Sequence, residues 1–287
     1  MSAVPSTAGE IHLRALRPDD LDACHSLSAA VGWAHRREDW TLVLGLGQGL
    51  AAIAEGELVG TAMWWAFGSG HASLGSIIVA PGRQGAGIGK LLMQGLIEAT
   101  RGRSRGLIAT EEGRPLYAKY GFVPAGTVLQ HQGSAPAIAA LPLDPGETLR
   151  LATEADLPVL AGLDEAATGL PRAPVLAALL DRGEAHVLER DGVVAGFAVL
   201  RRHGLGWLIG PVAAIDDRAA RCLIAHGLAA RPGEFIRVDV PAPTGLGGWL
   251  GERGLPQVAS GLVMAHGQPP IARGPARLFA LVNQALG

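Results

Sequence analysis

One stretch decides the fold of this chain: Ser76-Ile77-Ile78-Val79-Ala80-Pro81-Gly82-Arg83-Gln84-Gly85-Ala86-Gly87-Ile88-Gly89-Lys90-Leu91-Leu92. It begins with a β-branched run that Pro81 stops, which predicts a buried strand over Ile77, Ile78 and Val79. After Gly89 the apolar residues recur at helical spacing. We therefore expect the chain to pass from a strand, through a glycine-rich turn, into a helix.

The glycine-rich turn has the chemistry of an anion site. The first backbone N–H groups of a helix lack helical partners, and the helix dipole adds partial positive charge there. Glycines let the backbone adopt positive φ and approach a ligand closely. Arg83 and Lys90 flank the turn with formal charge, although both would also suit a solvated surface. A diphosphate is expected to bind these two cations and the backbone between them, which comprises Gln84, Gly85, Ala86, Gly87, Ile88 and Gly89.

Two common nucleotide-binding motifs do not fit the turn. The dinucleotide motif G-x-G-x-x-G fails because Lys90 stands at the sixth position from Gly85, and Leu92 at the sixth position from Gly87. The Walker motif fails because Gln84 lies five residues before Gly89. The pattern that does fit is Gln84-x-x-Gly87-x-Gly89, which by itself would also suit a plain structural turn.

A second segment follows the helix. Gly106 to Thr110 predicts a strand parallel to the first, because a helical crossover joins them, and Pro115-Leu116-Tyr117-Ala118-Lys119-Tyr120-Gly121-Phe122 comes next. Together the two segments resemble the GNAT (GCN5-related N-acetyltransferase) superfamily. There a Q/R-x-x-G-x-G/A turn holds the pyrophosphate of coenzyme A, and an L-Y-x-x-x-G-F segment closes the acyl-CoA site. The resemblance covers residues 10 to 130.

The resemblance implies both a fold and a reaction. The fold is α/β (α+β): tandem GNAT folds, each a mixed, mostly antiparallel sheet with a parallel central pair splayed at the acyl-CoA site and flanked by helices. The reaction uses acetyl-CoA as co-substrate and passes the acetyl group directly to an amine. The pantetheine arm is expected along Ile77, Ile78 and Val79, with the backbone N–H of Val79 polarising the thioester carbonyl.

Tyr117 is the candidate general acid. A phenol has a pKa near 10, so it stays protonated at neutral pH and can serve a thiolate whose thiol pKa is about 8.5 to 9. The alternative is that Tyr117 only packs or orders the coenzyme. No general base is evident: Glu111, Glu112 and His71 flank the two central strands, but each also suits a solvated loop.

The element order recurs in the second part of the chain. Arg14 to Leu21 can be laid on Arg150 to Leu157, and Leu58 to Gly60 on Val194 to Gly196, both at a displacement of 136. The later copy lacks three residues of the turn and carries Asp216 and Asp217 instead, which would repel a diphosphate. We predict a catalytic GNAT domain over residues 1–143 and a degenerate GNAT-like domain over 147–287, acting as an acceptor-site cover or as an interaction domain.

The acceptor is the least defined partner. In the later copy, Asp239 could meet an amine and Arg172 could meet a carboxylate, although such residues usually form structural pairs. We expect a small-molecule amine. Peptide or protein N-acetylation, a non-catalytic acyl-CoA sensor and a scaffold without a ligand remain alternatives.

Composition limits the remaining classes. A formal net charge of −2 gives no electrostatic footprint for nucleic acid, and no apolar run approaches a membrane span. Residues 1–10 lack the pattern of a secretion signal, so a cytoplasmic location is expected, as a monomer or homodimer. Cys24 and Cys222 suit ordinary buried thiols, and no histidine pattern indicates a metal.

Overall fold

The computed structural model describes residues 11–287, which form two compact units. Unit 1 contains residues 11–64 and 76–101, and unit 2 contains residues 65–75 and 102–287. The prediction that no secretion signal is present concerns residues 1–10, which lie outside the described residues.

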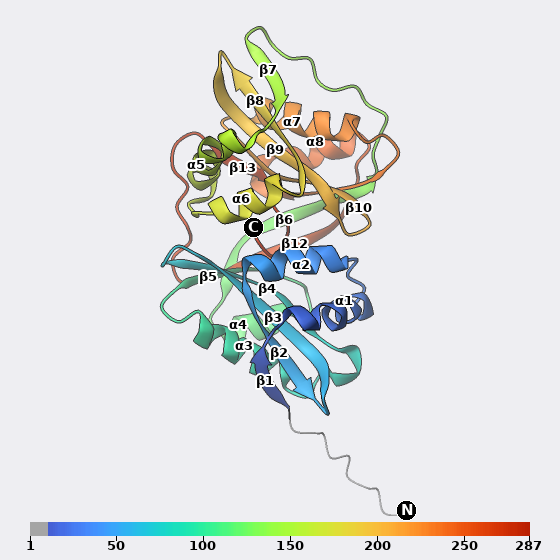
Figure 1. Cartoon of the computed structure of the whole chain (residues 1–287), viewed down its shortest axis with the longest axis vertical. Coiled ribbons are helices and arrows are strands. Elements are labelled where there is room, and N and C mark those ends of the chain that lie inside the picture. The colour runs from blue at the N-terminus through green and yellow to red at the C-terminus, as the bar shows by residue number, and fades with distance from the viewer. Residues whose placement is uncertain (1–10) are drawn as a thin grey trace, which may run out of the picture. The chain divides into compact units, whose positions relative to one another are not determined.

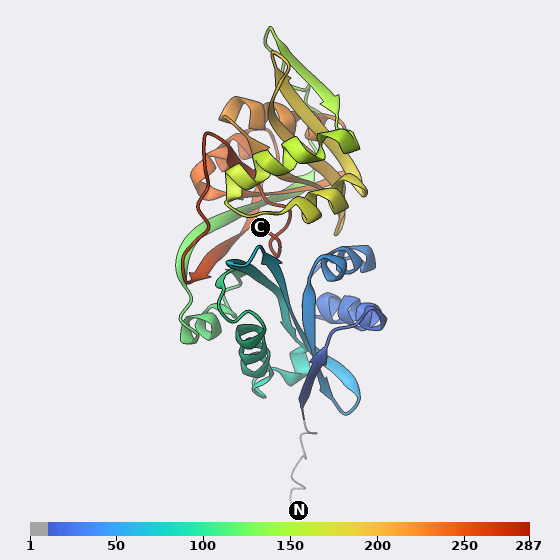
Figure 2. The same cartoon turned by 60° about the vertical axis from the view of Figure 1, so that its left-hand side comes forward.

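Unit 1 contains the first strands of a 13-stranded sheet, in the order β1-β2-β3-β4, with helices on both faces. Its elements are β1 (His12–Ala15), η1 (Pro18–Asp20), α1 (Leu21–Ala30), α2 (Arg37–Leu46), β2 (Gln48–Ala54), most of β3 (Glu57–Phe67), the end of β4 (His71–Val79), η2 (Pro81–Arg83) and α3 (Ile88–Ala99). β2 pairs antiparallel with both β1 and β3. Figure 2 shows α1 and α2 on one face and α3 on the other. The apolar residues after the turn recur at helical spacing, so α3 has one apolar face, and its residues Leu92, Met93 and Leu96 are fully buried.

Unit 2 contains the larger part of this sheet, with helices on both faces. Its elements after β4 are β5 (Ser104–Ala109), α4 (Arg114–Lys119), β6 (Val123–Ser134), β7 (Glu147–Leu151), η3 (Glu154–Asp156), α5 (Leu157–Thr168), α6 (Ala173–Leu180), β8 (Gly183–Arg190), β9 (Val193–His203), β10 (Gly206–Ala214), α7 (Asp217–Ala229), β11 (Phe235–Pro241), η4 (Ala242–Thr244), α8 (Leu246–Glu252), β12 (Gln257–His266) and β13 (Arg277–Ala280). The strand order is β4-β5-β12-β6-β11-β10-β9-β8-β7, and β13 pairs with β10. Figure 2 shows α5 and α6 on one face and α7 and α8 on the other.

The fold class predicted from sequence is confirmed. The sheet is mixed and mostly antiparallel, and helices flank it. Each sequence copy contributes one parallel pair: β4 with β5, where His71 lies opposite Ser104, and β10 with β11, where Trp207 lies opposite Ile236.

The two copies exchange their last strands within unit 2. β12, from the later copy, lies between β5 and β6 of the first copy, with Met264 opposite Leu107 (Figure 1). β6 in turn pairs with β11 of the later copy, where His131 lies opposite Val238. The boundary at residues 143–147 stays a prediction about the sequence copies, while the compact units divide the chain elsewhere.

Matched contacts support the internal repeat. Arg14 and Asp20 form an ion pair at 2.7 Å, and Arg150 and Asp156 form the same pair at 2.7 Å. Each aspartate also accepts a backbone N–H at the start of its 3-10 helix, from Arg17 at 2.8 Å and from Thr153 at 2.7 Å. These arginine contacts hold the pKa of both carboxyl groups below the usual range.

Two aligned glycines share one packing role. A Cβ on Gly60 would lie 3.0 Å from the carbonyl oxygen of Ile78, and a Cβ on Gly196 would lie 3.0 Å from that of Ala213. Both glycines therefore permit a close approach of the neighbouring strand, β4 in one copy and β10 in the other.

Candidate functional site

The turn before α3 has the backbone that a bound anion requires. Gly85 and Gly87 have φ angles of 81° and 82°, a conformation that residues with a side chain rarely adopt. A Cβ at either position would meet nothing within 4 Å, so the space beside the turn is open. The glycines are needed for their backbone conformation and for access, because no packing requires them.

The first turn of α3 presents backbone donors. Gly87 is the N-cap residue, and among residues 11–287 no side chain caps it. The N–H of Leu91 makes an intrahelical bond to the carbonyl of Gly87 at 3.0 Å, so the N–H groups of Ile88 and Gly89 precede the hydrogen-bond ladder. The side chain of Ile88 is 1% exposed and holds the helix start in the core.

The polar side chains of the turn lie at the surface. Gln84 and Lys90 are exposed, and the Gln84 amide donates to the carbonyl of Val79 at 3.4 Å. Arg83 pairs with Glu55 at 2.8 Å, and both side chains are well exposed. An exposed pair of this kind is weak, so the Arg83 guanidinium can turn to a stronger anion at little cost.

β4 has an irregular residue where it enters the predicted cofactor strand. Ser76 has a φ of 50°, and its carbonyl accepts a hydrogen bond from the buried Thr61 hydroxyl at 2.9 Å. A left-handed serine inside a strand interrupts the pleat and re-aims Ile77 to Val79. This feature is not predictable from the sequence, because a serine before a β-branched run gives no sign of a left-handed φ.

Tyr117 lies on α4 in unit 2. Its side chain is 7% exposed, and burial raises its pKa to about 12. The Tyr117 ring packs edge-on against the Phe122 ring, with 6.4 Å between the two ring centroids. It also covers Gly113, where a Cβ would lie 2.8 Å from a carbon of the Tyr117 ring. The phenol is therefore held in one place and stays neutral across the physiological pH range.

Residues of the later copy support this tyrosine through the exchanged strand. His266 at the end of β12 lies 5.7 Å from Phe122, ring to ring, and its Nδ1 lies 3.2 Å from the Arg105 guanidinium on β5. Burial lowers the pKa of Arg105. The packing behind Tyr117 is thus shared by both copies of the sequence.

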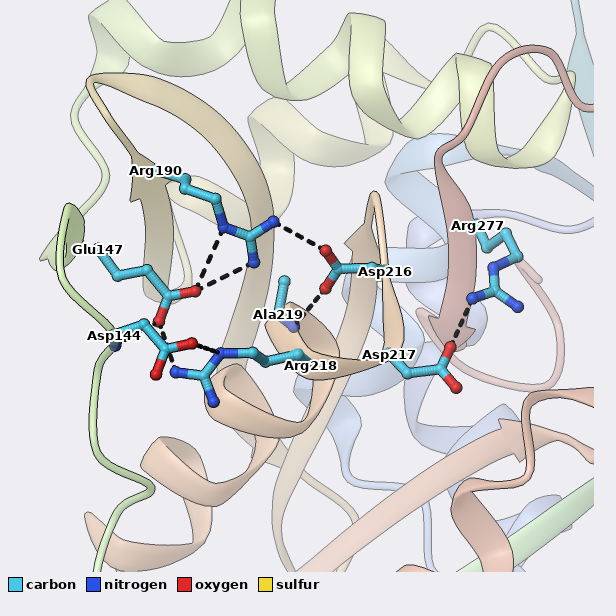
Figure 3. A network of polar contacts seen from close by, with 8 residues as sticks. All are labelled: Asp144, Glu147, Arg190, Asp216, Asp217, Arg218, Ala219 and Arg277. Carbon is cyan, nitrogen blue, oxygen red and sulfur yellow. Dashed lines mark hydrogen bonds and ion pairs between the residues drawn. The ribbon is translucent and has the colours of Figure 1, made fainter.

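In the later copy, the position of the turn is filled by the chain's own charges (Figure 3). Asp216 is the N-cap residue of α7, and its carboxylate accepts the N–H of Ala219 at 2.8 Å. Arg190 pairs with the same carboxylate at 2.8 Å, and Arg277 pairs with Asp217 in the next position. The Asp216 carboxylate satisfies a backbone N–H of the first turn and places negative charge at the helix start, and both effects disfavour a diphosphate there.

The charge network extends from Asp216 into the core. The Glu147 side chain is 1% exposed and pairs with Arg190 at 3.0 Å and with Arg218 at 2.8 Å (Figure 3). Arg218 also reaches Asp144 at 2.6 Å. The acidic residues predicted to repel a diphosphate thus belong to a paired cluster that fixes the start of α7.

The strand edge of the later copy is filled as well. Residues 212–214 of β10 align with residues 77–79 of β4 at a displacement of 135. They pair with β13: Val212 lies opposite Ala280, and Ala214 lies opposite Arg277. The edge that would receive a pantetheine arm therefore already carries a strand of the same chain.

The two acceptor candidates have partners inside the fold. Arg172 is 1% exposed, forms two hydrogen bonds to Asp164 at 2.9 and 2.7 Å, and donates to the carbonyl oxygen of Gly287 at 2.6 Å. Asp239 is fully buried and pairs with Arg237 at 2.8 Å. This geometry favours the structural alternative for both residues.

The remaining candidates are placed as follows. Glu111 and Glu112 are exposed in the turn between β5 and α4, and His71 is the half-buried first residue of β4. Cys24 and Cys222 are buried free thiols, as predicted. Among residues 11–287 no group of three or more metal-binding side chains comes together. None of the helices described has the length and apolar character of a membrane span.

Family models match both copies of the sequence. A model of the acetyltransferase (GNAT) domain matches residues 46–124, which include the α3 turn. A second model with the same description matches residues 160–280. The uncharacterized N-acetyltransferase YitH of Bacillus subtilis is 30% identical over 220 residues, which cover 75% of this chain and 76% of that protein.

Solved structures share the whole architecture. A presumed acetyltransferase from Pyrococcus horikoshii has a TM-score of 0.81 at 21% identity, covering 100% of this chain and 99% of its own. A tandem GNAT protein from the clavulanic acid biosynthesis pathway has a TM-score of 0.68 at 13% identity, covering 90% of this chain and 98% of its own. At these identities the likeness establishes the fold: two GNAT-like halves in one chain.

Proposed function

Because the chain belongs to the GNAT superfamily of acetyltransferases, we propose that it moves the acetyl group of acetyl-CoA directly to the amine of a small molecule, without a covalent enzyme intermediate. One contrast carries the proposal. The start of α3 is uncapped by side chains and the space beside Gly85 and Gly87 is open, whereas the start of α7 is capped by Asp216. The first copy therefore keeps an anion site that the later copy has replaced.

The residues of the first copy fit the cofactor. The backbone around Gly85 and Gly87 can donate to the diphosphate, and the adjacent helix dipole favours negative charge. Arg83 and Lys90 add charge at the two ends of the turn. The pantetheine arm is assigned to the edge formed by residues 77–79, in line with the prediction from sequence.

The chemistry requires alignment, polarisation and a proton. The acceptor nitrogen attacks the thioester carbon, the C–S bond breaks, and the departing sulfur takes up a proton while the nitrogen loses one. The backbone N–H of Val79 is assigned to the thioester oxygen, where developing negative charge is stabilised best by a fixed donor. Tyr117 is assigned to the departing sulfur, because its buried phenol retains its proton.

Release of the coenzyme A thiol tests the proposal. The purified chain is mixed with acetyl-CoA and, in turn, with spermidine, glucosamine, glycine and a tetrapeptide, and free thiol is measured. Release that depends on one of the first three amines supports the proposal, whereas release with the tetrapeptide alone indicates peptide acetylation.

Thermal unfolding separates the remaining alternatives. A ligand at 100 times its Kd should stabilise the fold by about 2.7 kcal/mol. Stabilisation by acetyl-CoA without thiol release would indicate a sensor. No stabilisation and no release would indicate a scaffold, and would contradict the proposed function.

A further inference from the structure

The segment that follows β13 packs within the later copy and contacts β4 of the first copy. We call residues 281–287 the distal segment. The N–H of Leu281 donates to the carbonyl of Asp239 on β11 at 2.9 Å, and the carbonyl of Val282 accepts from Arg201 on β9 at 2.9 Å. The segment is therefore attached to two strands as soon as it leaves β13.

The end of the distal segment is held just as firmly. The Asn283 side chain accepts the N–H groups of Ala285 and Leu286 at 2.9 and 2.8 Å, which closes a tight turn. Arg172 donates to the carbonyl oxygens of Leu286 and Gly287 at 3.2 and 2.6 Å. Because Arg172 is itself locked to the buried Asp164, the position of this turn is fixed by the core.

The turn of the distal segment contacts β4 at Ala285. The Ser73 hydroxyl donates to the Ala285 carbonyl at 2.6 Å. A Cβ on Gly75 would lie 2.9 Å from the Ala285 Cβ, so the glycine is required for the two backbones to meet. Ser73 and Gly75 directly precede Ser76, where β4 turns into the strand assigned to the thioester.

We propose that Ala285, with its partner Ser73, is a positioning residue of the transfer reaction: the distal segment fixes β4 just before Ser76, and so sets the direction in which residues 77–79 present their backbone N–H groups. This inference rests on the proposed function. A donor that stabilises developing charge must be held within a few tenths of an ångström. The pairs of β4 with β5 run from His71 to Ser73, so the distal segment supports β4 where that pairing ends. The distal segment thus gives the degenerate copy a part in catalysis.

A steric exchange tests the inference. Gly75→Ala should push β4 away from Ala285 and lower kcat about tenfold, while the Kd for acetyl-CoA stays within about twofold, because the diphosphate site on α3 is unchanged. Adding Ala285→Gly removes the nearest atom, the Ala285 Cβ, and leaves the Ala285 Cα and the Trp65 ring at 3.2 Å from the new methyl group. The double variant should therefore recover a large part of the lost kcat, to within about threefold of the wild type. The measurements are thiol release with the best of the amines named above and calorimetry with acetyl-CoA.

Gly106→Ala is the matched control. Gly106 lies opposite Ser73 on β5, where a Cβ would meet nothing within 4 Å, so this variant should leave kcat unchanged. A double variant no more active than Gly75→Ala, or a Kd for acetyl-CoA that rises as kcat falls, would overturn the inference. A wild-type chain that releases no thiol with any of the amines contradicts the proposed function, and this inference with it.

Ser73→Ala covers the case in which Gly75→Ala does not fold. It removes the hydrogen bond to Ala285 without steric strain. We expect kcat to fall by about threefold or more and the Kd for acetyl-CoA to stay unchanged. An unaltered kcat in this variant counts against the inference.

Discussion

At the scale of single residues, Gly87 combines a φ of 82° with open space where a Cβ would be. Gly87→Ala should therefore strain the turn by about 1 kcal/mol and weaken acetyl-CoA binding about fivefold without disturbing the core. Gly82→Ala is the control, since Gly82 lies in the same connection with open space but without positive φ. Calorimetry measures the Kd for acetyl-CoA of both variants. Equal Kd values for Gly87→Ala and Gly82→Ala would show that the turn does not hold the coenzyme.

Tyr117 supports a second prediction at this scale. Tyr117→Phe should lower kcat about 100-fold, the low end for loss of a general acid, with little change in the Kd for acetyl-CoA. Tyr120→Phe, at the only other tyrosine, is the control. Because the pKa of Tyr117 is raised to about 12, the wild-type rate should show no decline near pH 10 from ionisation of this phenol. An unchanged kcat in Tyr117→Phe would remove the acid role.

Some residues of the site could be predicted from sequence and others could not. The passage from strand to helix was predictable, because it depends on a local pattern: Gln84, Gly87 and Gly89 lie close together in the sequence. The left-handed φ of Ser76 goes with a hydrogen bond from the distant Thr61 hydroxyl to its carbonyl, and the sequence around Ser76 does not indicate this contact. Arg172 and Asp239 were assigned by charge alone, and burial gives both of them structural partners.

At the scale of elements, β13 and the capped start of α7 fill the positions in the later copy that correspond to the proposed cofactor site. We predict one acetyl-CoA per chain by calorimetry, because β13 occupies the edge of β10 and Asp216 occupies the helix start. The Asp216→Gly variant, which removes the cap but leaves β13, should still bind one. A stoichiometry of two in the wild type would contradict the interpretation of the later copy as degenerate.

The elements themselves were largely predictable, because strands and helices follow local periodicity. The predicted strand over residues 77–79 and the helix after Gly89 are both present, in β4 and α3. β13 was not predicted. Its four residues form a strand because they pair with the edge of β10. Such pairing depends on the folded chain, so the sequence of the segment does not predict it.

At the scale of the whole molecule, the strand exchange predicts that residues 1–143 will not fold alone. That fragment loses β12, the partner of β5 and β6, and β11, the other partner of β6. Three strand edges would be exposed, so aggregation is expected by size-exclusion chromatography. Co-expression with residues 144–287 should restore a folded complex. A monomeric fragment with cooperative unfolding would contradict this prediction.

The repeat was predictable from sequence, and the exchange was not. Aligned arginines, aspartates and glycines mark the two copies at a nearly constant displacement. Burial does not alternate along β6, where Val128 and His131 are buried, or along β12, where Gly261 and Met264 are buried. The sequences of these strands therefore do not specify which neighbour completes the ladder. The predicted boundary at residues 143–147 follows from the sequence repeat alone, and the compact units do not follow it.

The interleaved strands have a consequence for inheritance. A copy that no longer binds a coenzyme would ordinarily be free to decay or to be deleted. Here loss of the later copy would destabilise the first copy, because β5 and β6 of the first copy pair with β12 and β11 of the later copy. Selection that keeps the first copy folded would therefore also keep β11 and β12 of the later copy, while the start of α7 and the edge of β10, which make no strand pair with the first copy, could change more freely.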